Sequence, residues 1–276
     1  MLLDKNFRRF VVAIFDGDEP SSSEPIGSGF LYAVRDTGVR ELLGSDITSE
    51  STWNVWLVTA KHVLENQNVG SMIQTRNSIR VRIYVDLDYV IDVDDDNWYR
   101  HTDADVAVYK LNYPLSKDEF YKWAVAGQND CLREEMQKYQ LEESQQVVLM
   151  GFPYGWAEVS QDDPVVRLGA IAQIQGWFRE EMDYFLVDGH GFPGMSGGPV
   201  VSIPDCLHIL GEYGDDMSLN RNVIVGMISE RTFSQIEGAE TSDGYSPHIE
   251  ESGDLVRVVP MDTIFETIQM AISELM

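Results

Sequence analysis

Short apolar stretches, separated by glycine, proline and acidic residues, recur along the whole chain. Within residues 77–86 the apolar side chains of Ile79 and Val81 alternate with the polar side chains of Arg80 and Arg82. A period of two is typical of a β-strand with one buried face. Comparable stretches cover residues 10–15, 29–34, 55–60, 105–111, 146–152, 165–174, 184–188, 198–203 and 222–229. Many short strands with few helices between them predict an all-β fold of sandwich or barrel type rather than a doubly wound α/β sheet.

Two segments carry the signals of helices. The C-terminal stretch repeats apolar residues at helical spacing, at Ile264, Ile268, Ile272 and Leu275. Thr263 and Glu266 have the spacing of a capping box, which predicts that this helix begins beside them. A shorter helix is predicted over residues 116–123, and the polar residues 36–53 and 232–252 predict long surface loops.

The strand-rich segments fall into two halves with a change of character between them. Residues 1–112 and 146–260 each contain a set of predicted strands, while residues 113–145 are more helical and polar. We therefore expect two β-units over these halves, a connecting segment between them and a C-terminal helix over residues 261–276.

The chain carries 46 acidic and 20 basic residues, a formal net charge of −26. This charge repels the phosphates of nucleic acids and anionic membrane surfaces, so we expect neither as a partner. The sequence contains no run of apolar residues long enough for a transmembrane helix. Cys131 and Cys206 are too few for a disulfide framework, and the N-terminus lacks a secretory signal pattern, which together favour a reduced, cytoplasmic protein.

The stretch GHGFPGMSGGPVV, residues 189–201, places five glycines around Ser196. A flexible linker is one interpretation, but strand-like apolar segments lie close on both sides. The alternative is a nucleophile loop, in which glycine lets backbone N–H groups approach a reacting carbonyl. The pattern G-x-S-x-G also occurs in the nucleophile elbow of α/β-hydrolases, but Gly197, Gly198 and Pro199 do not favour the helix that must follow that elbow.

A base and an acid precede Ser196 in the chain. His62 follows an apolar stretch, and Asp105 stands directly before another. A strand end is a rigid mount for a catalytic base, and a half-buried carboxylate can hold an imidazole in one tautomer. Asp103 is a competing acid, but Asp105 is preferred because of its position directly before the apolar residues. We expect His101 to support the loop that leads to Asp105.

The segments TAKH, DVAV and GMSGGPVV, in this order, resemble the corresponding segments of the trypsin-like (chymotrypsin-fold) serine proteases. The bacterial and intracellular HtrA/Deg-like branch, without its PDZ domains, is most similar, and the resemblance extends from residue 27 to residue 260. It implies an all-β fold of two six-stranded antiparallel β-barrels. The first barrel would carry His62 and Asp105, and the second would carry Ser196.

The resemblance also implies a role for each of these residues. Ser196 would be the nucleophile, His62 the general base, and Asp105 the acid that orients the base. The backbone N–H groups of Gly194 and Ser196 would form the oxyanion hole. His190, six residues before the nucleophile, is expected to line the specificity pocket.

Ser229 and Glu230 match the strand that pairs with an extended substrate in this family. We therefore predict a serine endopeptidase that forms an acyl-enzyme intermediate, acts on a specific intracellular protein and needs no cofactor. A regulatory protein partner is a further expectation. Two alternatives stay open: a catalytically silent homologue that serves as a binding scaffold, and an esterase with the same triad.

The acidic stretch over residues 86–105 raises a metal hypothesis. Asp92, Asp94 and Asp96 have the D-x-D-x-D spacing of a calcium-binding EF-hand loop. Asn97 replaces the glycine that the turn of such a loop requires, and no predicted helices flank the segment. A solvated acidic hairpin is the favoured interpretation, and we predict no metal site.

Overall fold

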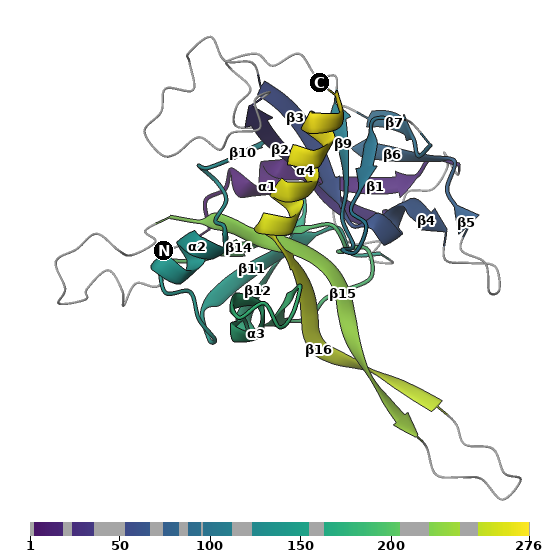
Figure 1. Cartoon of the computed structure of the whole chain (residues 1–276). Helices are drawn as coiled ribbons and strands as arrows, with labels where there is room; N and C mark the ends of the chain where they lie inside the picture. Colours follow the sequence, from purple (N-terminus) through teal and green to yellow (C-terminus); the bar gives the residue numbers. More distant parts are fainter. Residues whose placement is uncertain are drawn as a thin grey trace, which may run out of the picture.

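Two β-sheets, one from each half of the chain, lie side by side and form the body of the molecule (Figure 1). This computed structural model describes residues 3–18, 24–35, 53–66, 74–82, 88–94, 96–111, 123–154, 163–204, 221–237 and 248–275. Mostly β-structure with one C-terminal helix confirms the predicted fold class, that of a chymotrypsin-like double barrel.

The first sheet curls into an open half-barrel among the described strands. Its order is β7-β6-β1-β2-β3-β9-β8, with antiparallel neighbours throughout, and β10 adds to β2 in parallel. The strands are β1 (Val11–Asp16), β2 (Gly27–Arg35), β3 (Trp53–Thr59), β6 (Ser78–Arg82), β7 (Asp88–Asp92), β8 (Trp98–Arg100), β9 (Ala107–Leu111) and β10 (Ala124–Val125). The sheet has eight strands rather than six, partly because β10 comes from the segment predicted to be a connection.

The second sheet is a closed antiparallel barrel of six strands, as predicted. Around the barrel the order is β11-β12-β13-β16-β15-β14. The strands are β11 (Gln146–Gly151), β12 (Val165–Gln173), β13 (Phe185–Asp188), β14 (Pro199–Ser202), β15 (Val223–Glu237) and β16 (His248–Pro260). The barrel interior is apolar and includes Leu149, Val187 and Val258.

Apolar contacts join the two sheets. Val148 and Met150 alternate with Leu149 on β11, so they face out of the barrel and are buried in one cluster with Phe30 and Ile14 of the first sheet. The two sheets therefore share a continuous apolar interface that holds them in a fixed relation.

Short elements complete the described fold. β4 (Glu65–Asn66) and β5 (Gln74–Thr75) form a two-stranded sheet. The short helices are α1 (Phe7–Phe10), the 3₁₀ helix η1 (Lys61–Leu64), α2 (Arg133–Lys138) and α3 (Gln175–Phe178). None of the helices within the described ranges combines the length and the apolar composition that crossing a membrane requires.

The predicted C-terminal helix is α4 (Met261–Leu275), which crosses from the second barrel back to the first sheet (Figure 1). Ile264, Ile268 and Ile272 are buried in the cluster of the first sheet, as their spacing predicted. The helix begins at Met261, directly after β16, which agrees with the predicted range of 261–276, whereas the capping box at Thr263 and Glu266 does not mark its start. Thr263 thus lies inside the helix, where its carbonyl accepts a hydrogen bond from the hydroxyl of Thr267.

The loop predicted over residues 232–252 was also wrong in part. β15 and β16 continue past the barrel as a two-stranded ribbon, paired from Phe233 opposite Ser252 to Glu237 opposite His248. The ribbon projects from the body (Figure 1). The predicted loop at 36–52 and residues 116–122 of the predicted helix lie outside the described residues.

Candidate active site

His62 stands at the end of a buried strand. β3 is almost wholly buried, and the chain turns after Thr59 into η1, in which His62 is the second residue. Its backbone position is therefore set by a strand that has no freedom to move without disrupting the core.

Asp105 lies in the loop between β8 and β9, and His101 shapes that loop. Nδ1 of His101 accepts hydrogen bonds from the backbone N–H groups of Asp103 (3.1 Å) and Ala104 (2.8 Å). Nζ of Lys61 donates to the carbonyl oxygen of His101 at 3.1 Å, which ties the loop to η1. These contacts confirm the expected supporting role of His101.

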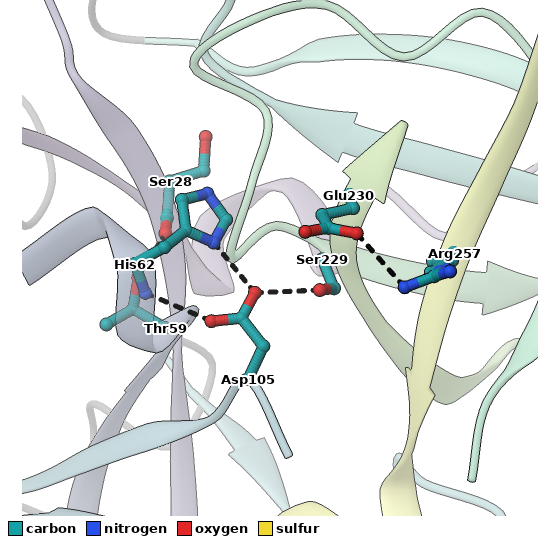
Figure 2. Close-up of polar contacts among 7 residues, drawn as sticks. All are labelled: Ser28, Thr59, His62, Asp105, Ser229, Glu230 and Arg257. Atoms are coloured by element: carbon teal, nitrogen blue, oxygen red, sulfur yellow. Dashed lines mark hydrogen bonds and ion pairs between the residues drawn. The ribbon is translucent and has the colours of Figure 1, made fainter. Parts of the chain in front are cut away.

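Asp105 contacts His62 through both carboxylate oxygens (Figure 2). Oδ2 lies 2.7 Å from Nδ1 of His62, and Oδ1 accepts the backbone N–H of His62 at 3.0 Å. The hydroxyl of Ser229 donates a third hydrogen bond to Oδ2, at 2.7 Å. Asp103 is exposed, and its carboxylate accepts from Thr102, so the structure brings Asp105 and not Asp103 to His62.

The environment shifts the pKa values of this pair in opposite directions. Burial alone would lower the pKa of His62, but the hydrogen bond to Asp105 and the charge of Asp105 outweigh it, with smaller contributions from Glu230 and Glu65. The pKa of His62 is thereby raised above 6.5. Burial would raise the pKa of Asp105, but the contacts with His62 and Ser229 outweigh it and lower that pKa below its ordinary value.

The backbone before β14 folds tightly around Ser196. Gly194 and Gly197 have φ angles of +88° and +89°, which side chains rarely tolerate. A Cβ on Gly197 would collide with the carbonyl oxygen of Ser28, and one on Gly194 with the backbone of Phe152 and Tyr154. The loop is thus a packed segment and not a flexible linker.

Ser28, at the start of β2, connects this loop to the strand that leads to His62. Its N–H donates to the carbonyl oxygen of Ser196 (2.8 Å), and its hydroxyl donates to that of Gly194 (2.7 Å). The hydroxyl of Thr59 donates to the carbonyl oxygen of Ser28 at 2.8 Å (Figure 2). Sequence reasoning missed Ser28, since a small residue at the start of a strand carries no signal of its partners.

The backbone N–H groups and the hydroxyl at the proposed reaction centre of the loop make few hydrogen bonds within the protein. Within the described residues, the N–H groups of Gly194 and Ser196 donate no hydrogen bond, whereas the N–H of Met195 between them donates to the carbonyl oxygen of Phe192 at 3.1 Å. In the same part of the chain, the structure shows no hydrogen bond between the hydroxyl of Ser196 and His62.

Comparison with protein families gives one match. The model of the trypsin-like peptidase domain matches residues 27–205, which include His62, Asp105 and Ser196. The chain belongs to this family. Comparison with curated proteins finds no match.

Three further residues of this member of the trypsin-like peptidase family were predicted to contact substrate. Nδ1 of His190 lies 2.6 Å from Oδ1 of Asp254, and both side chains are exposed. Oε2 of Glu230 lies 3.1 Å from Nη1 of Arg257 (Figure 2). Ser229 is buried and its hydroxyl binds Asp105, a contact that sequence reasoning did not predict.

The described part of the acidic stretch, residues 88–94 and 96–105, includes β7, β8 and the loop that leads to Asp105. Asp92 ends β7, and one of its carboxylate oxygens accepts the N–H of Asp94 at 3.1 Å. The described residues contain no group of three or more histidine, cysteine, aspartate or glutamate side chains placed to hold a metal ion. Asp95, in the same stretch, lies outside the described residues.

Proposed function

We propose that the protein is a serine endopeptidase in which Ser196 is the nucleophile, His62 the general base, and Asp105 the acid that orients the base. The contact of 2.7 Å between Nδ1 of His62 and Asp105 carries this proposal. An ionised carboxylate only accepts hydrogen bonds, so the proton of a neutral His62 is on Nδ1 and the lone pair is on Nε2.

The proposed reaction proceeds in two steps. The hydroxyl oxygen of Ser196 attacks the peptide carbonyl while its proton passes to Nε2 of His62. The imidazolium that forms is stabilised by Asp105, and it then gives its proton to the departing amine. Water hydrolyses the acyl-enzyme by the same route, with Nε2 again accepting and returning a proton.

Two backbone groups are proposed to stabilise the oxyanion of the tetrahedral intermediate. The N–H groups of Gly194 and Ser196 are without acceptors in the described residues, and the intervening Met195 N–H is held by Phe192. The N–H groups on either side of Met195 are thus both available to donate to a single oxygen of the substrate. Such a pair contributes roughly 3 kcal/mol or more to transition-state stabilisation.

The strand after Ser229 favours an extended peptide over a small ester. β14 pairs with β15 only up to Met227, so beyond it no described strand pairs with this edge of β15. A peptide in extended conformation can add to such an edge through main-chain hydrogen bonds. The paucity of cysteines and the burial of Cys131 favour a reduced, cytoplasmic compartment. A peptidase in that compartment must spare the other proteins of the cell, so we propose one specific protein substrate.

Hydrolysis of a peptide library by the purified protein tests this proposal. We expect cleavage of internal peptide bonds, and loss of that cleavage in Ser196→Ala with an unchanged circular dichroism spectrum. Hydrolysis of esters without any peptide cleavage would favour the esterase alternative. Absence of both activities in the folded protein would favour the silent scaffold.

A further inference from the structure

Arg167 lies at the rim of the second barrel beside the loop that leads to Ser196. It is on the same side of β12 as Ile171, which is buried in the barrel interior. Its pairing partner on β11 is Leu149, another interior residue. Arg167 is only partly exposed, its Nε is buried, and its guanidinium carbon lies 4.8 Å from the ring centroid of Phe192.

Among the described residues from 123 onward, three arginines stack on aromatic rings, and one of them differs from the others. Arg133 lies over Trp177 and pairs with Glu180 at 2.9 Å. Arg257 lies over Tyr184 and pairs with Glu230 at 3.1 Å. Within the described ranges Arg167 makes neither an ion pair nor a hydrogen bond.

This difference is informative in a chain with 46 acidic and 20 basic residues. Carboxylates outnumber cations more than twofold in this chain. A partly buried guanidinium without a carboxylate partner is therefore unexpected, and it is available for a carboxylate from outside the chain. Guanidinium groups bind carboxylates in a bidentate geometry, and a partly buried one recovers little of the lost hydration from an aromatic ring alone.

The unpaired guanidinium is tied to the proposed nucleophile through Phe192. The carbonyl oxygen of Phe192 accepts the N–H of Met195, which closes a turn immediately before Ser196. A substrate whose carbonyl carbon reaches Ser196 therefore brings its adjacent side chain to the same loop. The long side chain of Arg167 can meet a carboxylate there.

We propose that Arg167 binds the carboxylate side chain of the residue that supplies the acyl carbonyl, so that the enzyme cleaves after glutamate or aspartate. This assignment rests on the proposed peptidase function. The negative charge of the whole protein opposes acidic substrates only weakly at this range, because salt screens exposed charges beyond about 8 Å at physiological ionic strength, whereas Arg167 acts in direct contact.

Matched peptides test the assignment. Fluorogenic peptides with amidated C-termini would carry glutamate, glutamine, leucine or lysine at the position before the scissile bond and be otherwise identical. For the wild type we expect kcat/KM to be higher for glutamate than for glutamine by about tenfold or more, the range of one charge-assisted hydrogen-bonded contact. For Arg167→Gln we expect this ratio to fall close to one.

Two controls keep the test decisive. Arg133→Gln removes a stacked arginine that already has a carboxylate partner, and it should leave the glutamate preference intact. Arg167→Lys keeps a charge on a flexible stem and should retain part of the preference. The wild-type ratio is informative even if Arg167→Gln does not fold.

The outcome separates this inference from the proposed function. Ser196 would be labelled with a fluorophosphonate in parallel. Suppose that Ser196 is labelled but the wild type prefers leucine, lysine or glutamine, or that Arg167→Gln keeps the glutamate preference. Either result would overturn the role of Arg167 and leave the peptidase proposal standing. Failure of the label on folded protein would overturn both.

Discussion

Among the described residues, two histidine–aspartate pairs have almost the same distance between nitrogen and oxygen but lie in different surroundings. His62 and Asp105 are 2.7 Å apart, with side chains 27% and 24% exposed. His190 and Asp254 are 2.6 Å apart, with side chains 51% and 66% exposed. A short contact between an imidazole and a carboxylate is therefore not by itself the mark of a catalytic base in this molecule.

The two pairs differ in the contacts around the carboxylate. Asp105 accepts hydrogen bonds from the His62 side chain, the His62 backbone and Ser229, so its orientation is fixed. The carboxylate of Asp254 has His190 as its side-chain partner and lies largely in water, where exposed ion pairs contribute little. Partial burial and several partners, rather than distance, are what prepare an imidazole to act as a base.

The largest expected difference between the two pairs lies in their histidines. We expect His62→Ala to lower kcat by about 10⁴-fold or more, because the nucleophile loses its base and triad members act as a unit. His190→Ala should change kcat/KM by no more than about tenfold, since His190 does not contact the proposed triad. Steady-state kinetics on one peptide would check both, and comparable losses in the two variants would contradict the distinction.

The next largest difference is expected between Asp105 and the neighbouring Asp103. Asp105→Asn keeps the shape of the side chain but removes the charge that holds Nδ1 protonated, and we expect kcat to fall by about 10⁴-fold. Asp103→Asn should have a far milder effect, because Asp103 is exposed and does not contact His62. A larger loss in Asp103→Asn than in Asp105→Asn would show that the wrong acid has been assigned.

A smaller difference between the two pairs comes from Ser229, whose hydroxyl donates a hydrogen bond to Asp105. Within the described residues, Asp254 accepts no hydrogen bond from a serine. We expect Ser229→Ala to lower kcat by about tenfold, as a single hydrogen bond to the charged carboxylate of Asp105 is lost. The carboxylate of Asp105 would then interact more strongly with protonated His62, so the pKa of His62 should rise. The acid limb of the pH profile of kcat/KM should move to higher pH, and an unmoved or lowered limb would exclude this positioning role.

The smallest expected effect comes from Glu230. In the wild type the base form of His62 is required, so activity should rise with pH through a midpoint above 6.5. Glu230→Gln removes a negative charge that raises the pKa of His62, and it leaves Arg257 without this partner, so the midpoint should move to lower pH. The shift should shrink as salt is added, because the side chain of Glu230 is substantially exposed. A midpoint that moves upward would contradict this electrostatic assignment.

The sequence contained most of what was needed to find the candidate residues. His62 and Asp105 flank apolar strands, and local pattern is enough to place a side chain at a strand end. The preference for Asp105 over Asp103 rested on the same local argument, and the structure brings Asp105 to His62.

Contacts between distant segments could not be predicted in the same way. Ser229 is 124 positions from Asp105, and Ser28 is 166 from Gly194. A serine carries no local signal of such a partner, because its donor can serve backbone, side chain or water equally well. The ribbon of β15 and β16 was missed because the sequence over residues 232–237 and 248–252 lacks the regular alternation of apolar and polar residues by which strands are predicted.

Active-site labelling tests the central claim most directly. The folded wild type and His62→Ala would be treated with diisopropyl fluorophosphate, and the modified residue located by mass spectrometry of peptide digests. The account predicts a single adduct on Ser196 in the wild type, formed orders of magnitude more slowly in His62→Ala. No adduct on Ser196, or equal rates in the two proteins, would contradict a serine activated by His62.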